Sequence, residues 1–218
     1  MVKLGSTLRE HLLDLLVPED ARVERLLSQG FEKVRLLLPE SRVRLSNVNV
    51  LFDYQSRTVK SLIHLLKFKN NMRVRKFFAL CICDTLTSLS SDMMLFENRR
   101  PIIVPVPMSK NELRGRGFNQ MEELLSEVNK ISGGNLDIRY DILEKIRETP
   151  RQTHLGREER SKNIRNSMRV KRGAESRAKD QIFIVVDDVY TTGATFDETR
   201  RALALSEAKD CIGVFVAH

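Results

Sequence analysis

Apolar residues recur along the chain at two different spacings, and these spacings separate the expected helices from the expected strands. Over residues 4–17 and 21–38 they return every three or four positions, which predicts two amphipathic helices, each followed by a proline, Pro18 or Pro39. Residues 47–54 instead alternate apolar and polar side chains, the pattern of a strand. The helical spacing returns after Ser56, a residue suited to cap a helix, and again over roughly 73–89, 121–131 and 194–206.

Short apolar runs of the kind found in buried strands alternate with these helices. They occupy residues 101–107, 141–147, 181–187 and 211–217. Strands that alternate with helices predict an α/β fold with a doubly wound, mainly parallel sheet. We expect residues 46–218 to form this domain and residues 1–45 to form a short helical N-terminal appendage.

Composition narrows the class of protein further. A chain of 218 residues can bury one substantial core, and no uninterrupted apolar run approaches the ~18–20 residues of a membrane span. The three cysteines, Cys81, Cys83 and Cys211, are odd in number and lack C-x-x-C spacing, so we expect reduced thiols and a cytoplasmic protein.

Most of the net charge of +8 arises in residues 139–179, which contain thirteen lysines and arginines against six acids. Such a segment can neutralise a pyrophosphate, contact nucleic acid or simply aid solubility.

One stretch, IFIVVDDVYTTGAT at residues 182–195, carries most of the chemistry. Asp187 and Asp188 follow a buried strand, and in open α/β sheets ligands bind beyond the carboxyl ends of strands. We expect both carboxylates to face solvent and to hold sugar hydroxyls or a hydrated Mg²⁺. A glycine- and threonine-rich turn that leads into a helix presents backbone N–H groups to an anion. The residues of this expected 5-phosphate site are Thr191, Thr192, Gly193, Ala194 and Thr195.

A core strand that ends in ordinary solvated acids is the alternative interpretation of this stretch. The chain contains neither a Walker loop nor the G-x-G-x-x-G dinucleotide fingerprint. The order of acids, threonines and glycine resembles the phosphoribosyl-pyrophosphate motif of type I phosphoribosyltransferases.

Three further motifs resemble the ComF family in particular. Residues 104–108 (VPVPM), followed by 113–120 (LRGRGFNQ), are similar to the family's VPVP and RGFNQ signature. Tyr54 and the Lys67-Phe68-Lys69 segment resemble an earlier strand and helix end of the family. Residues 147–163 match a third run through Thr149, Gln152, Leu155, Arg157, Arg160 and Asn163.

The resemblance implies a type I phosphoribosyltransferase fold and a role in natural transformation, the uptake and handling of single-stranded DNA. It implies that the acids, here Asp187 and Asp188, take part in catalysis by holding the ribose. The pyrophosphate contacts would be Pro105, Val106, Pro107 and Arg116. Gly115 and Gly117 around Arg116 fit a flexible anion loop or a plain turn followed by a helix. For Arg157, Arg160 and Asn163, phosphate or nucleic-acid contacts and a solvated surface both remain open.

The chain departs from the family at its start, where ComF proteins usually carry a four-cysteine zinc module. The first 60 residues contain no cysteine and one histidine, His11, so we expect no direct zinc ligands there. We therefore expect a ComF-like protein that binds phosphoribosyl pyrophosphate with Mg²⁺. The alternatives are a nucleobase-salvage phosphoribosyltransferase and a non-catalytic ligand sensor that binds single-stranded DNA or a competence helicase. The sequence identifies neither a general base nor a pocket for an acceptor base.

Overall fold

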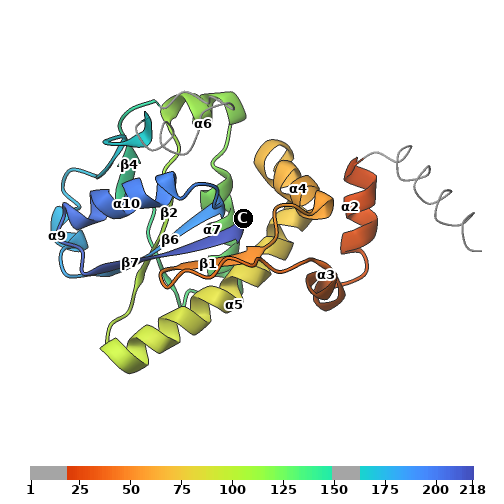
Figure 1. Cartoon of the computed structure of the whole chain (residues 1–218), viewed down its shortest axis with the longest axis horizontal. Coiled ribbons are helices and arrows are strands. Elements are labelled where there is room, and N and C mark those ends of the chain that lie inside the picture. Colours follow the sequence, from red (N-terminus) through yellow and green to blue (C-terminus); the bar gives the residue numbers. More distant parts are fainter. Residues whose placement is uncertain (1–18, 149–162) are drawn as a thin grey trace, which may run out of the picture.

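The computed structural model describes residues 19–148 and 163–218 (Figure 1). Its main sheet has five strands in the order β1-β7-β6-β2-β3, and every neighbouring pair is parallel. The predicted α/β fold with a mainly parallel sheet is therefore confirmed. The strands of this sheet are β1 (Val48–Phe52), β2 (Ile102–Pro105), β3 (Asp137–Ile138), β6 (Ile182–Val189) and β7 (Asp210–Ala217).

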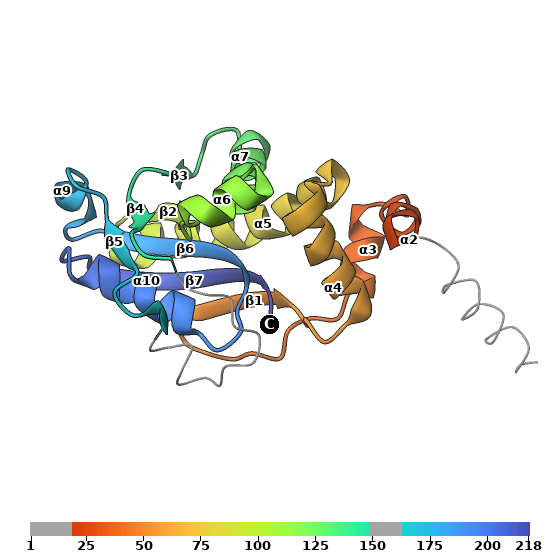
Figure 2. The ribbon, with the colours of Figure 1, turned by 90° about the horizontal axis from the view of Figure 1, so that it is seen from above.

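Helices cover both faces of the sheet, α5 and α7 on one side and α10 on the other (Figure 2). The alternation of side chains along β6 explains this arrangement. Ile184 and Val186 pack into the core shared with α5 and α7, whereas Phe183 and Val185 pack into the core shared with α10. The helical segments are α2 (Glu19–Leu27), α3 (Phe31–Leu37), α4 (Arg57–His64), the π-helix η1 (Leu65–Lys69), α5 (Met72–Glu97), α6 (Lys110–Arg116), α7 (Gln120–Ile131), α9 (Glu175–Ala178) and α10 (Ala194–Ala204).

The single helix predicted over residues 21–38 is wrong, because two helices, α2 and α3, occupy this region. Gly30, with a φ of 92°, separates them and begins α3. Positive φ is favourable for glycine, and the chain changes direction there. Val23, Val34 and Leu38 are buried in the same core as α5. The helix predicted over residues 4–17 lies outside the described residues, and the domain boundary at residue 45 stays a prediction.

The segment predicted as a strand over residues 141–147 does not join the parallel sheet. Its central residues form β4 (Leu143–Lys145), which pairs antiparallel with β5 (Met168–Val170) in a separate two-stranded sheet. The edge position beside β2 is taken by β3 instead. Because β3 has two residues and β5 has three, neither is long enough to give a periodic signal.

Helix α5 extends to Glu97, beyond the predicted end near residue 89. Among the described residues it is the one helix long and apolar enough to cross a membrane by length and composition, a test that core helices also pass. Its buried residues include Val74, Phe78, Ile82 and Leu86, and they belong to the core beneath the sheet. The apolar character of α5 is accounted for by this packing.

Candidate functional site

A cleft of about 470 Å³ lies at the carboxyl ends of β2 and β6. This is the edge of an open α/β sheet at which ligands bind. Its walls come from segments far apart in the sequence, among them η1, the residues just after β2, helices α6 and α7, the β4–β5 pair, and the end of β6 with the turn into α10. The residues that line it include Tyr54, Lys67, Phe68, Arg116, Gln120, Asp187, Asp188, Thr191 and Thr195.

Asp188 is buried in this cleft, with 5% of its surface exposed. Its Oδ1 lies 2.9 Å from Nζ of Lys67, and its Oδ2 accepts a hydrogen bond of 3.0 Å from Nε2 of Gln120. The expectation that both acids face solvent is therefore wrong for Asp188. A buried carboxylate needs a counter-charge and hydrogen-bond donors, and Lys67 and Gln120 supply them.

Asp187 remains partly exposed in the cleft. Its Oδ1 accepts a hydrogen bond of 2.8 Å from the backbone N–H of Asp188. Desolvation within the protein, followed by repulsion from Asp188, raises the pKa of Asp187 from 3.8 to about 7, although Lys67 acts in the opposite direction. The two acids thus have different environments: Asp188 is neutralised by a lysine, whereas Asp187 faces the space that a ligand would occupy.

Lys67 is a site residue to which the sequence analysis gave no role. Burial lowers its pKa, but the attraction of Asp188, with smaller contributions from Asp187 and Tyr54, outweighs this effect and the pKa of Lys67 is raised. Lys67 and Phe68 reach the cleft from η1, where the predicted α-helix ends in one π-helical turn. The Lys67-Phe68-Lys69 pattern was visible in the sequence, but nothing local paired it with Asp188.

The turn expected to bind a 5-phosphate leads from β6 into α10. Gly193 adopts a left-handed conformation with a φ of 83° and precedes the first residue of α10. The backbone therefore favours glycine, and a Cβ at this position would lie 2.6 Å from the hydroxyl oxygen of Tyr190, so the Tyr190 side chain would have to move. Thr191 and Thr195 line the cleft, whereas Gly193 and Ala194 are buried and offer backbone groups only. The first N–H groups of a helix lack intrahelical partners, which suits an anion at this end of α10.

The expected pyrophosphate segment lies on the neighbouring wall. Val106 and Pro107 line the cleft, and the backbone N–H of Val106 donates to the carbonyl of Val186, 3.0 Å away. This bond joins the end of β2 to the strand that carries the acids. Pro105 is buried at the end of β2.

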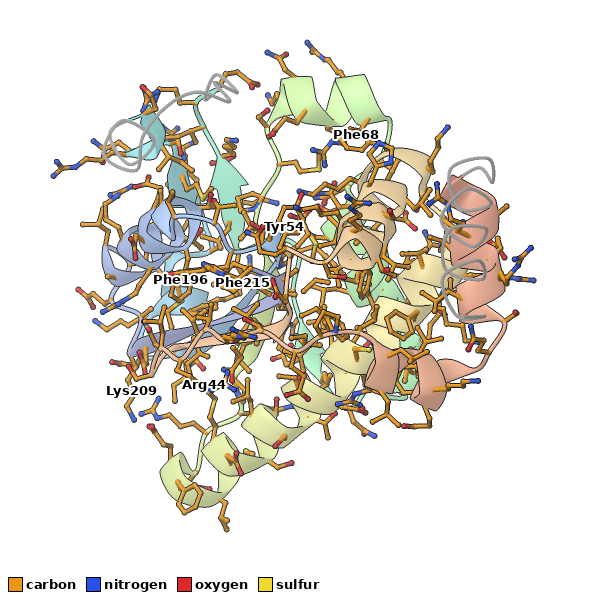
Figure 3. The ribbon with its side chains drawn as sticks, turned by 45° about the vertical axis from the view of Figure 1, so that its right-hand side comes forward. Arg44, Tyr54, Phe68, Phe196, Lys209 and Phe215 are labelled. Carbon is orange, nitrogen blue, oxygen red and sulfur yellow. The ribbon has the colours of Figure 1, made fainter. Side chains whose placement is uncertain are left out.

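The segment around Arg116 is a helix rather than a flexible loop. Helix α6 begins with a capping box between Ser109 and Glu112 and ends at Gly117, whose φ is 78°. Nη1 of Arg116 donates a hydrogen bond of 2.6 Å to Oε1 of Gln120, and its guanidinium lies 5.3 Å from the centre of the Phe68 ring. Figure 3 shows Phe68 close to α6. A continuous chain of contacts therefore joins Arg116, Gln120 and Asp188.

The third family motif contributes less to the described cleft. Arg157 and Arg160 lie outside the described residues. Asn163 is described but does not line the cleft formed by the described residues, and its carbonyl oxygen accepts a hydrogen bond of 2.7 Å from Nη2 of Arg147. The phosphate or nucleic-acid role of these three residues stays a prediction.

Comparison with known proteins supports the resemblance seen in the motifs. The chain is 28% identical over 161 residues to the competence protein ComFC of Streptococcus pneumoniae, covering 73% of this chain and 63% of that protein. It is 29% identical over 143 residues to the DNA utilization protein YhgH of Salmonella typhimurium, covering 65% of this chain and 59% of that protein. The chain thus spans less than two thirds of the length of these relatives. No protein-family model matches the chain.

Solved structures with some likeness include two hypoxanthine phosphoribosyltransferases. The Trypanosoma cruzi protein is 11% identical with a TM-score of 0.38, covering 63% of this chain and 65% of that one. The Staphylococcus aureus protein is 9% identical with a TM-score of 0.35, covering 63% and 62%. The predicted resemblance to the ComF family is confirmed by the two relatives, and the parallel sheet with helices on both faces is consistent with a type I phosphoribosyltransferase fold.

The donor set of the cleft fits a magnesium ion bound together with a ligand. Mg²⁺ prefers oxygen and is usually held by one or two carboxylates plus substrate phosphates and water. Asp187 supplies a partly exposed carboxylate at the cleft. Among the described residues no group of three or more histidine, cysteine or acidic side chains could hold a metal by itself. Asp187 could therefore supply one carboxylate to an ion whose other oxygens come from a ligand and water.

Proposed function

We propose that this competence-related, phosphoribosyltransferase-like chain binds phosphoribosyl pyrophosphate with Mg²⁺ in the cleft. The observation that carries the proposal is the convergence of three separate motifs on one site. The acid pair and the threonine turn come from residues 187–195, Val106 and Pro107 from the proline segment, and Arg116 with Gln120 from the RGFNQ motif. A ligand with a diol, a phosphate and a pyrophosphate matches these three kinds of group.

Each part of the ligand is assigned to the wall of the cleft that carries suitable groups. In the proposal, Asp187, which lines the cleft, accepts hydrogen bonds from ribose hydroxyls, and the Thr191–Thr195 turn supplies N–H and hydroxyl donors to the 5-phosphate. Val106, Pro107 and Arg116 also line the cleft, and in the proposal they contact the pyrophosphate. Mg²⁺, when bound, would neutralise charge on the leaving pyrophosphate.

If the chain transfers the phosphoribosyl group, its residues would act mainly by orientation and electrostatics. Departure of pyrophosphate leaves positive charge near C1 of the ribose. A carboxylate held beside the ribose stabilises that charge, and a cation beside the pyrophosphate stabilises the leaving group. Asp187 and Arg116 occupy these two positions in the proposal.

Titration calorimetry with phosphoribosyl pyrophosphate and Mg²⁺ tests this proposal directly. Wild-type protein should bind, and Asp187→Asn should weaken binding by ~10- to 150-fold, since the lost hydrogen bonds involve a charged group. Asp92→Asn is the matched control, because Asp92 is an exposed acid on α5 that does not line the cleft formed by the described residues and should have little effect. Absence of wild-type binding, or equal affinities for wild type and Asp187→Asn, would contradict the proposal.

A second candidate function is a sensor that binds the same ligand without catalysing transfer. In this version the cleft senses phosphoribosyl pyrophosphate, while the basic 139–179 segment contacts single-stranded DNA or a helicase partner in the cytoplasm. The favouring observations are the positive surplus of that segment and the similarity to a relative named as a DNA utilization protein. Release of pyrophosphate with a panel of nucleobases separates the candidates: turnover with one base supports a transferase, including a salvage enzyme, and binding without turnover supports the sensor.

A further inference from the structure

Both oxygens of Asp188 are already engaged within the protein. Oδ1 pairs with Nζ of Lys67 at 2.9 Å and Oδ2 accepts from Gln120 at 3.0 Å. The side chains of Lys67 and Asp188 are 23% and 7% exposed, so the pair lies where water screens it little. A ligand that took the oxygens of Asp188 would first have to displace a charged amine and an amide.

Asp187 differs from Asp188 in this respect. Among the described residues, the only hydrogen bond that its carboxylate accepts reaches Oδ1, from the backbone N–H of Asp188. Oδ2 of Asp187 accepts none from that part of the chain, and the side chain lines the cleft. Because Asp188 presents this N–H, the position of Asp188 also fixes the orientation of the Asp187 carboxylate.

Lys67 reaches Asp188 because of an unusual piece of helix. The turn Leu65–Lys69 is π-helical, and Asn70 after it is left-handed with a φ of 46°. Wide turns of this kind are rare and often occur at functional sites. Leu65 and Leu66 are buried in the core, while Lys67 lines the cleft. The π-helical turn thus places the Lys67 ammonium group beside the acid pair.

We propose that Lys67 is a positioning residue: with Gln120 it holds Asp188 as an internal anchor, so that Asp187 alone of the two acids meets the ligand. This inference rests on the proposed function and refines it, since it assigns the ribose contact to one acid. The competing arrangement is a latch, in which the ligand displaces Lys67 and binds Asp188 itself. The two arrangements predict opposite consequences when the lysine is removed.

The experiment compares Lys67→Met, Lys67→Arg, Asp188→Asn and the double variant Lys67→Met with Asp188→Asn. Each is titrated with phosphoribosyl pyrophosphate and Mg²⁺, and each is melted without ligand. Lys67→Met leaves a buried carboxylate without its cation beside Asp187, so affinity should fall roughly tenfold or more and the Tm should drop. Lys67→Arg keeps the charge and should retain most of the affinity.

The double variant decides the question even if Lys67→Met folds poorly. The introduced methionine and asparagine form a neutral pair, and the asparagine retains a side-chain oxygen that can accept from Gln120. The double variant should recover most of the Tm and most of the affinity lost in Lys67→Met. Tighter binding by Lys67→Met, or a double variant that is stable but does not bind, would overturn the inference in favour of Asp188 as the ligand contact. Wild-type protein that fails to bind would overturn the proposed function, and this inference with it.

Discussion

The two principal walls of the cleft are built in different ways. The turn wall, Thr191–Thr195, is one continuous stretch whose shape follows from its own residues, above all Gly193. The assembled wall consists of Lys67, Phe68, Arg116 and Gln120, which come from η1, α6 and α7. The turn wall offers donors for an anion, whereas the assembled wall fixes the acids at the end of β6.

Substitutions in the two walls should therefore act through different physical effects. A change in the turn wall acts through backbone geometry, because the neighbouring residues of one segment must keep their dihedral angles. A change in the assembled wall acts through the partners that it leaves buried and unsatisfied. The two walls meet at Asp187, which belongs to the β6 strand end but whose surroundings are set by Lys67 and Asp188.

The largest effect is expected from Gly193→Ala in the turn wall. The left-handed backbone costs an alanine roughly 1–2 kcal/mol, and the new Cβ would lie 2.6 Å from the Tyr190 hydroxyl. We expect the free energy of unfolding to fall by about 2–4 kcal/mol, with loss of ligand binding. Urea denaturation and calorimetry measure both. Gly173→Ala is the matched control, since the φ of Gly173 is 85° but nothing lies within 4 Å of the added Cβ. Similar losses in both variants would contradict the prediction that Tyr190 adds to the cost at Gly193.

Gln120→Leu breaks the assembled wall at its centre. It removes the donor to Asp188 and the acceptor of Arg116, so the free energy of unfolding should fall by ~1–3 kcal/mol. Chemical denaturation provides the measurement. Asn129→Leu removes an amide from an exposed position of the same helix and should be close to neutral. Equal stability of the two variants would show that the contacts of Gln120 contribute little.

The pH dependence of the free energy of unfolding tests the environment of Asp187, the residue at which the two walls meet. The pKa of native Asp187 is raised from 3.8 to about 7, so the native state binds more protons than the unfolded chain between these values. Stability should therefore fall as pH rises across that range. Asp187→Asn removes this pH-dependent loss of stability, so above about pH 8 the variant should be more stable than wild type by roughly 1–2 kcal/mol. This value is smaller than the full pKa difference would give, because water reaches the side chain. The difference should vanish towards about pH 4; parallel stability curves across this range would contradict the assignment.

The smallest effect is expected from Thr192→Ala. Its hydroxyl oxygen accepts from the backbone N–H of Ala194 at 3.4 Å, a long hydrogen bond, and its side chain is partly exposed. Backbone donors around Gly193 remain, so affinity for phosphoribosyl pyrophosphate should fall by only ~0.5–1.5 kcal/mol while stability changes little. Calorimetry on this variant, with Thr58→Ala on exposed α4 surface as control, measures the contribution of the side chain. A loss as large as that of Gly193→Ala would mean that side chains rather than backbone dominate the turn wall.

Elements whose signals are local could be predicted from the residues alone. The apolar run at residues 182–186 and the Thr-Thr-Gly turn placed the start of β6 and the start of α10 correctly, although β6 extends to Val189 and so includes both acids. The α/β class followed from the order of strands and helices. These features depend on neighbouring residues, because side-chain periodicity and backbone dihedral preferences act over a few positions.

The residues that surround the two acids depend on the folded arrangement of distant segments. Gln120 and Asp188 are 68 positions apart, and no local pattern predicts that they share a hydrogen bond. The same holds for Lys67, whose reach to Asp188 depends on a π-helical turn, and for β4, which leaves the main sheet to pair with β5. In each case the outcome depends on burial: a carboxylate that the fold takes out of water is stable only where other segments bring a cation and donors to it.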